Sequence, residues 1–567
     1  MFWQESEKLI LSLPTDSLEE PVSSLPKREN KALGFAARNP GFVPLAAVSL
    51  AYWALFLGVL PVRLTLGTAA SLVEPQPVAA VRRLLAGENL YQDYRHGRPV
   101  LPLTYGVLAY AAPAVLDKTL GIKTPEGVYR TGRAFSFAGM AGCAAMLFLL
   151  ARQRGVSRMG AWTAVLPLAW FPYIAEWFTR FTPDAAALLF SLAGWAVLGP
   201  PAPGSRESSS RKDTGAPAKS EWMRGVIAVC LWLAAFHLKP TQLAGQIAFA
   251  VEWLAAGRGQ ASRPGADWRS ALRRVFFLAA GYTAAVAATI WLLQVSTGGN
   301  WKLNAVDSMS AHGFRLAFIS DAFKGFGSAP IAGAAPLSDW AGGKGVLLMM
   351  LVWAIVSLRR SPLHGAYCAL LGIELLFLTK RGGNINYLLG SLSLWAVATA
   401  VALRRTGAAD GARTPSLSAQ VPAVLISVLL LADIGRAGKL NFEIPLSPPA
   451  DLQAVDRLVA PCAAGEVLVA DGVYGAARDL PYLFADCFHA SLLARSGAVD
   501  FSAEIESIQL CRYRLIVTNL FHLGRARYQD TPMFPQALGE AIRRHYRVVH
   551  RGKWFVVWEP ASPDSYS

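Results

Sequence analysis

The sequence contains little charge for its length. Only 16% of its 567 residues are Asp, Glu, Lys or Arg, and 53% are hydrophobic, whereas soluble proteins carry about 25% charged residues. The mean hydropathy is +0.34. This shortage of charge excludes an ordinary soluble protein, and the long apolar runs indicate a chain that crosses a membrane many times.

Cysteine and internal repeats are also scarce. The chain has six cysteines, and neither a CxxC pair nor a Cys/His zinc spacing occurs, which excludes a zinc site built on cysteine. Cys462, Cys487 and Cys511 lie in the C-terminal part, where one disulfide is compatible with an oxidising compartment. The absence of a visible internal repeat gives no support to an inverted-repeat transporter.

Positive charge is in excess, with a formal net charge of +16. The clusters of Lys and Arg fall in loops between apolar segments, which is typical of cytoplasmic loops in membrane proteins rather than of a nucleic-acid-binding surface. Residues 1–42 are charged and polar and lack the apolar core of a signal peptide, so they indicate a mobile cytoplasmic tail.

The apolar segments predict a transmembrane domain over residues 43–437. A helix needs about 20 apolar residues to cross a bilayer, and about 11 segments approach this length. They are 44–64, 134–150, 161–177, 185–198, 226–237, 243–255, 275–295, 346–358, 364–378, 387–403 and 421–432. The hydrophilic stretch 200–222 indicates a disordered insert.

Basic loops orient these segments. The Arg-rich or Lys-rich loops at 152–158, 200–222, 257–274, 359–360 and 404–405 predict the cytoplasmic side. Loops 65–130 and 296–343 and the C-terminus then lie outside an inner (cell) membrane that the chain crosses many times. This topology requires the short apolar stretch 102–116 to lie along the membrane interface without crossing it.

The character of the chain changes in residues 438–567. The stretches 466–471 and 514–519 predict strands, 548–559 predicts a hairpin, and 452–459 and 536–546 predict helices. We therefore expect a small extracytoplasmic α/β domain after the transmembrane domain.

One outer loop is unusually rich in polar and aromatic residues. Glu74 opens it, and a short amphipathic helix follows and ends at Gly87. Tyr91, Asp93 and Tyr105 come next, before another apolar run. Because an ordered loop of this kind is costly to maintain, we interpret it as a substrate loop with a catalytic task.

Ionisable residues gather at the predicted outer membrane edge. Besides Glu74 they include Arg180, Asp184, Lys239, Lys380 and Arg381. Carboxylates and cations on one face suit a reaction between an anionic lipid and a neutral acceptor: the cations hold phosphate, and a carboxylate removes a proton from a hydroxyl or binds a divalent metal.

Each of these residues also has a structural explanation. Glu74 beside Pro75 and Asp184 after Pro183 fit ordinary helix starts. The cations fit anchors at lipid headgroups, and Asp93 fits a solvated loop residue.

The order of these elements resembles the GT-C superfamily of polyprenyl-phosphate-sugar-dependent glycosyltransferases, the group with protein mannosyltransferases and lipid A aminoarabinose transferases. The resemblance covers residues 44–560. Its elements are an acidic residue opening the first outer loop (Glu74), Leu84-Leu85-Ala86-Gly87, Tyr91-Gln92-Asp93, a Pro-rich stretch from Arg98-Pro99, Asp184 and Lys239. The family often carries Asp one position before Glu74, where this chain has Val73.

The resemblance implies an all-α polytopic GT-C fold and an enzyme that moves a sugar from a polyprenyl-phosphate donor to a glycan, lipid or protein hydroxyl. Glu74 and Asp184 are then the catalytic carboxylates, or the ligands of a divalent cation such as Mg²⁺ or Mn²⁺. The implied cations for the donor phosphate are Lys239, Arg180, Lys380, Arg381 and Arg98. A transporter or flippase of a lipid-linked substrate and a catalytically degenerate scaffold are the alternatives.

Overall fold

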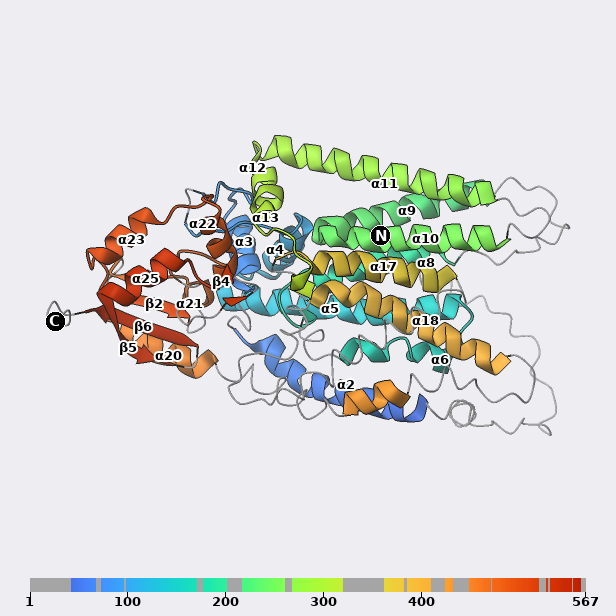
Figure 1. Cartoon of the computed structure of the whole chain (residues 1–567), viewed down its shortest axis with the longest axis horizontal. Helices are drawn as coiled ribbons and strands as arrows, with labels where there is room; N and C mark the ends of the chain where they lie inside the picture. The colour runs from blue at the N-terminus through green and yellow to red at the C-terminus, as the bar shows by residue number, and fades with distance from the viewer. Residues whose placement is uncertain are drawn as a thin grey trace.

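The structure is a computed structural model that places a helical bundle next to a C-terminal α/β domain (Figure 1). It describes residues 42–67, 73–95, 98–170, 177–200, 217–260, 268–319, 362–381, 385–408, 424–431, 448–463, 465–470, 472–519, 527–528, 531–552 and 554–561. The end of the bundle that faces the C-terminal domain is called the domain end below.

The bundle consists of long apolar helices and short connecting turns. Its elements are α2 (Phe42–Thr65), α5 (Pro125–Gln153), α6 (Arg158–Trp162), η1 (Leu166–Ala169), α8 (Asp184–Leu198), α9 (Pro217–Leu238), η2 (Pro240–Gln242), α10 (Leu243–Gln260), α11 (Trp268–Ser296), α17 (Pro362–Leu378), η4 (Ile385–Leu388) and α18 (Leu389–Ala408). Five short helical elements lie at the domain end: α3 (Pro75–Leu85), α4 (Leu108–Leu120), α12 (Asn300–Lys302), η3 (Leu303–Asp307) and α13 (Ser308–Ser310).

Four helices of the described residues are long and apolar enough to cross a membrane: Val43–Thr65, Pro125–Gln153, Glu221–Leu238 and Ala271–Ser296. Asp184–Leu198, Pro362–Leu378 and Asn386–Val401 are apolar but shorter. A multi-pass membrane chain therefore agrees with the structure, while the number of spans and their orientation stay predictions. The predicted span 346–358 and the predicted tail 1–42 lie outside the described residues, except for Phe42.

Three sequence-based boundaries were wrong. The predicted span 161–177 is not one helix, because α6 ends at Trp162 and a separate 3-10 turn contains Pro167, whose ring disfavours a continuing helix. The predicted insert 200–222 ends early, since α9 already begins at Pro217. The outer loop 296–343 begins with the helical elements α12, η3 and α13.

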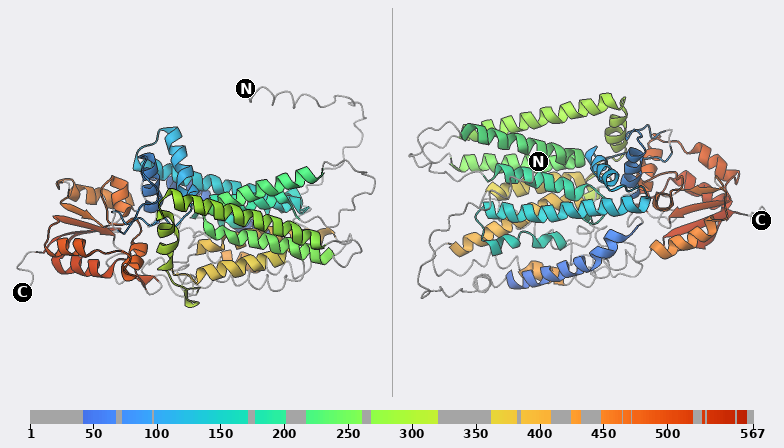
Figure 2. Two further views of the ribbon diagram at one scale, coloured as in Figure 1. Left: turned by 90° about the horizontal axis from the view of Figure 1, so that it is seen from above. Right: turned by 180° about the vertical axis from the view of Figure 1, so that it is seen from behind.

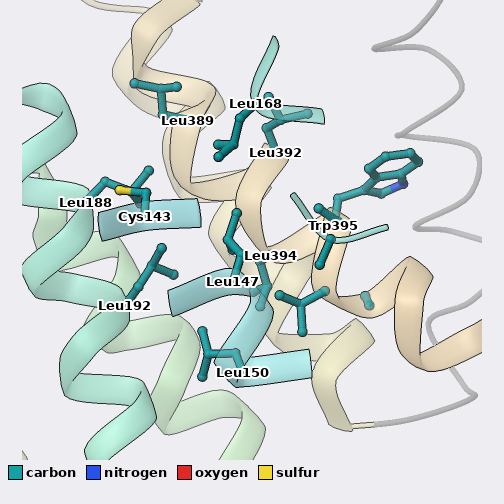
Figure 3. Close-up of a cluster of buried hydrophobic side chains, with 14 of the residues drawn as sticks. Cys143, Leu147, Leu150, Leu168, Leu188, Leu192, Leu389, Leu392, Leu394 and Trp395 are labelled. Atoms are coloured by element: carbon teal, nitrogen blue, oxygen red, sulfur yellow. The ribbon is translucent and has the colours of Figure 1, made fainter. Parts of the chain in front are cut away.

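The bundle core joins helices that are distant in sequence. Figure 3 shows Leu147 and Leu150 of α5 near Leu188 and Leu192 of α8 and near Leu392 of α18. Helices α5 and α8 approach so closely that a Cβ on Gly139 would lie 2.7 Å from the Ala186 amide nitrogen. Small residues permit such close helix contacts inside membranes. Helix α11 lies at the edge of the bundle (Figure 1), and its apolar window is only 6% buried.

The C-terminal domain contains a four-stranded sheet in the order β1-β2-β6-β5. The strands are β1 (Val467–Val469), β2 (Leu515–Asn519), β5 (Tyr546–Arg551) and β6 (Phe555–Pro560), with the small pair β3 (Arg527–Tyr528) and β4 (Thr531–Pro532) apart. β1 and β2 run parallel, and β6 is antiparallel to both β2 and β5. The helices are α20 (Pro448–Val459), α21 (Gly472–Arg478), α22 (Cys487–Arg495), α23 (Ser502–Gln509) and α25 (Gln536–His545). The predicted strands, hairpin and helices are thus confirmed, and Cys462, Cys487 and Cys511 are free.

The domain is firmly attached to the domain end of the bundle. Val78 and Val81 of α3 share a buried cluster with Val473 and Tyr474 of α21. Figure 2 shows α3 and α4 between the bundle and the domain from two further directions. With 13 residues, α4 is too short to cross a bilayer and packs against α3 and α5, as expected for the stretch 102–116.

Candidate active site at the domain end

Asp184 is the centre of a buried polar cluster. It begins α8 directly after Pro183, and its side chain is 1% exposed. Lys239 donates a hydrogen bond from Nζ to Asp184 Oδ1, and Asn386 Nδ2 donates to the same oxygen at 2.9 Å. Asp184 Oδ2 and Asn386 Oδ1 are buried without a hydrogen-bond partner among the described residues. Two acceptor oxygens therefore remain for a substrate hydroxyl.

Lys239 reaches this cluster from the turn between α9 and η2. Its backbone is extended before Pro240, and its ammonium lies 4.7 Å from the centre of the Tyr387 ring. Tyr105 lies close by because Gly106 packs against the backbone of His237, where a Cβ would overlap the carbonyl group. Burial and then the charge of Asp184 raise the pKa of Tyr105, so its hydroxyl stays protonated and is a hydrogen-bond donor.

Lys380 supplies a second cation directly after α17. Burial and the nearby Lys239 lower the pKa of Lys380 to about 8. Its Nζ contacts the Met309 sulfur at 3.6 Å, and no carboxylate in the described part of the chain forms an ion pair with it. A desolvated ammonium in this state gains stability from a bound anion. The guanidinium of the adjacent Arg381 lies 5.5 Å from the centre of the Phe318 ring.

Glu74 lies in a different arrangement from the one expected. Its side chain is 0% exposed, and Arg133 Nε and Nη2 donate to its two oxygens at 2.8 Å each. The Phe181 amide donates to Glu74 Oε1, also at 2.8 Å. Because both oxygens are bound and enclosed, this geometry is that of a structural ion pair between the start of α3 and α5.

Arg98 and Arg180 are not brought into contact with Asp184. Arg98 Nε donates to Glu504 of α23 at 2.7 Å, and its guanidinium lies 5.1 Å from the centre of the Phe501 ring. Arg98 therefore connects the first outer loop to the C-terminal domain. The Arg180 guanidinium lies 5.0 Å from the centre of the Trp177 ring.

The predicted substrate loop separates into packed and exposed residues. Tyr91 is 1% exposed within an apolar cluster that includes Leu103 and Trp301. Asp93 forms a 2.6 Å ion pair with Arg95. Of the three residues predicted from this loop, Tyr105 is the one whose pKa is raised by the charge of Asp184, after the larger effect of burial.

Asn304, in the outer loop 296–343, holds the substrate loop in place through hydrogen bonds to its backbone. It is fully buried, accepts a hydrogen bond from the Leu103 amide at 3.1 Å and donates to the Gln92 carbonyl at 2.8 Å. Asn304→Ala is expected to lower the free energy of unfolding by about 2–3 kcal/mol, because it leaves buried backbone groups unpaired. The measurement is chemical unfolding in mixed micelles. The exposed Gln453→Ala in α20 serves as the control, and equal losses for both variants would contradict this role.

The two predicted carboxylates do not fit one divalent cation. Arg133 binds Glu74 and Lys239 binds Asp184, so each carboxylate already has its own cation. The described residues contain no group of three or more His, Cys, Asp or Glu side chains suited to a metal.

Sequence reasoning missed Asn386, Tyr387, Arg133 and His489. Asn386 and Tyr387 follow Lys380 and Arg381 closely and precede an apolar helix, a position that could have indicated them. Asn386 and Tyr387 were missed because only charged side chains were considered as candidates there.

A small cavity of about 20 Å³ lies among α8, α10, α17 and α18. Its lining is mainly apolar, with Leu188, Leu192, Trp195, Leu370 and Leu394. A cavity of this volume holds about one water molecule.

No family model matches the sequence, and no curated protein matches it. Solved structures do match. Apo ArnT from Cupriavidus metallidurans aligns with a TM-score of 0.51 and 12% identity over 90% of this chain and 97% of ArnT. ArnT from the same organism bound to undecaprenyl phosphate gives 0.49 and 12% over 91% and 98%. The Archaeoglobus fulgidus oligosaccharyltransferase tethered to an acceptor peptide gives 0.48 and 10% over 90% and 74%. The match to apo ArnT shows that this chain has the GT-C fold.

Proposed function

From this shared fold and the Asp184 cluster, we propose that the protein is a membrane glycosyltransferase. It moves a sugar from a polyprenyl-phosphate donor to a hydroxyl of a glycan, lipid or protein. Undecaprenyl phosphate, which is bound in one ArnT structure, belongs to this class of carrier. The observation that carries the proposal is the buried Asp184–Lys239–Asn386 cluster next to Lys380, which has no carboxylate partner in the described residues.

The proposed reaction uses these residues directly. The acceptor oxygen attacks the anomeric carbon, and its proton passes to Asp184 Oδ2, the oxygen without a hydrogen-bond partner in the described part of the structure. The bond between the anomeric carbon and the carrier phosphate oxygen breaks as the new bond forms. Lys239 and Lys380 stabilise the negative charge that grows on the departing polyprenyl phosphate. Asn386 orients Asp184 through its 2.9 Å hydrogen bond.

The other predicted residues receive supporting roles in this proposal. Glu74 stabilises the domain end through Arg133, and Arg98 attaches the loop to the C-terminal domain. Arg180 and Arg381 are proposed to add positive potential for the carrier phosphate. We further propose that residues 43–437 form the transmembrane domain. The domain end and residues 438–567 are then extracytoplasmic, because the loops rich in Lys and Arg, which favour the cytoplasmic side, lie at other turns than those of the domain end.

The proposal predicts sugar release or transfer when purified protein is incubated with radiolabelled polyprenyl-phosphate sugars. Lys380→Met is expected to raise the donor KM by about 10- to 100-fold, because a charged hydrogen bond contributes about 1.5–3 kcal/mol. The kcat/KM of the wild type should also fall as pH rises through about 8, where free Lys380 loses its proton. Lys380→Met should lack this alkaline decline.

The matched control is Lys302→Met, which removes an exposed lysine that pairs with Asp307 at 2.6 Å. It should leave the donor KM unchanged. Failure of the wild type to bind or turn over any donor would reject the proposed function, and movement of intact donor across vesicles would favour the flippase alternative.

A further inference from the structure

Two histidines from distant parts of the chain meet where the C-terminal domain touches the long outer loop. His312 follows α13, and His489 lies in α22. Their Nε2 atoms are 3.3 Å apart, and their rings are nearly perpendicular at 84° with centroids 4.7 Å apart. Both side chains are buried. The proposed function assigns no role to this pair.

The hydrogen bonds determine where the protons of the pair lie. His312 Nδ1 is 2.6 Å from the Arg381 carbonyl oxygen. A carbonyl only accepts, so His312 Nδ1 carries the hydrogen and its Nε2 is an acceptor in the neutral ring. His489 Nε2 must then donate, and the Ser308 carbonyl at 3.3 Å is a second acceptor for the same hydrogen. The contact therefore requires a neutral His312.

The pair is connected to Lys380 through the backbone. Residues Phe314 and Lys380 form an antiparallel bridge. The Arg315 amide donates to the Thr379 carbonyl at 2.7 Å, and the Arg381 amide donates to the Gly313 carbonyl at 3.0 Å. The backbone after His312 is therefore hydrogen-bonded to the backbone around Lys380. His489, in turn, contacts His312 from α22.

We propose that His489 and His312 are positioning residues through which the C-terminal domain sets the place of Lys380, and that they act only while His312 is neutral. This inference rests on the proposed function, since Lys380 binds the carrier phosphate there. The C-terminal domain then completes the donor site without touching the donor. The peptide chain already joins the C-terminal domain to the bundle, so a buried hydrogen bond between two histidines is not needed to keep the two together.

Burial protects the pair from all but strong acid. A proton on His312 Nε2 would direct two N–H groups at each other. Lys380 and Arg381 face the pair from the end of α17, and Asp486 lies at the start of α22, where it accepts from the His489 amide at 3.1 Å. Burial lowers the pKa of His489 to about 4, and burial, His489 and Lys380 lower the pKa of His312 further. A protonated His489 still donates from Nε2, so the contact is complete from neutral pH down through the pKa of His489. It is lost only when His312, whose pKa lies lower, gains a proton.

The test compares His489→Phe, which removes the donor, with His489→Gln, whose amide restores an N–H. His489→Phe should raise the donor KM by about 10- to 100-fold with little change in kcat, and His489→Gln should stay near the wild type. His312→Asn keeps a donor for the Arg381 carbonyl but lacks the Nε2 acceptor, so it should match His489→Phe and serves if that variant does not fold.

Hydrogen exchange provides a readout that does not depend on the reaction. The Arg315 and Arg381 amides should exchange at least about tenfold faster in His489→Phe than in the wild type or His489→Gln. Unchanged exchange in a folded His489→Phe would overturn the inference, as would equal impairment of both His489 variants. Absence of transfer by the wild type with these exchange effects intact would reject the proposed function alone.

Discussion

Asp184→Asn is expected to reduce sugar transfer by about 10²- to 10⁴-fold, the usual contribution of a general base. The amide has the same shape and still accepts the Lys239 hydrogen bond, but it cannot take the proton of the acceptor hydroxyl. Donor binding should change by less than about tenfold because Lys239 and Lys380 remain. The measurement is single-turnover transfer of labelled sugar beside equilibrium binding of the donor.

Two further variants serve as a control and as a test of how Asp184 is oriented. Asp479→Asn removes a carboxylate that is 60% exposed and pairs with Arg82, and it should leave transfer unchanged. Asn386→Leu removes the side chain that orients Asp184 and should lower kcat more than it raises the donor KM. Near-normal transfer by Asp184→Asn would show that the base lies elsewhere.

Glu74→Gln is expected to destabilise the protein by about 3–5 kcal/mol, because it leaves a buried Arg133 without its carboxylate. Both side chains of this pair are 0% exposed, so water cannot compensate for the lost charge. The variant should therefore be recovered in low yield and unfold early in thermal and chemical denaturation. Loss of activity should follow the loss of folded protein.

The double variant Glu74→Gln/Arg133→Met tests the cause. Removing both charges should recover much of the lost stability, since the penalty comes from an uncompensated charge. Glu126→Gln is the matched control, because Glu126 and Arg130 are both more than half exposed and 3.9 Å apart; its effect should stay within about 1 kcal/mol. A stable Glu74→Gln protein without transfer activity would instead support Glu74 as the base.

Much of the helical architecture follows from the sequence by local rules. An apolar run must be helical inside a bilayer, where every backbone group needs an internal partner, so α2 and α8 were predicted within a few residues. The predicted spans in α5 and α11 start nine and seven residues too late, because both helices begin with charged turns that hydropathy leaves out. The strands of the C-terminal domain were also predictable, because alternating β-branched residues between turn residues are a local signal. The break between α6 and η1 was missed, since one proline inside an apolar run leaves the hydropathy high.

The sequence also indicated that the ionisable residues of several helix ends would gather at one end of the bundle. Alternating helix direction is enough for that prediction, and Asp184, Lys239 and Lys380 do lie at the domain end. The roles assigned to these residues remain proposals.

Only the tertiary structure determines which charged side chains pair with each other. Asp184 pairs with residues 55 and 202 positions away, and Glu74 with one 59 positions away, and no local pattern encodes such partners. Glu74 and Asp184 look equivalent in the sequence, but Glu74 is enclosed by an arginine fork whereas Asp184 keeps an oxygen without a protein partner among the described residues. Local sequence determines where helices and their charged ends lie, while long-range packing determines whether a carboxylate stabilises the fold or is available for chemistry.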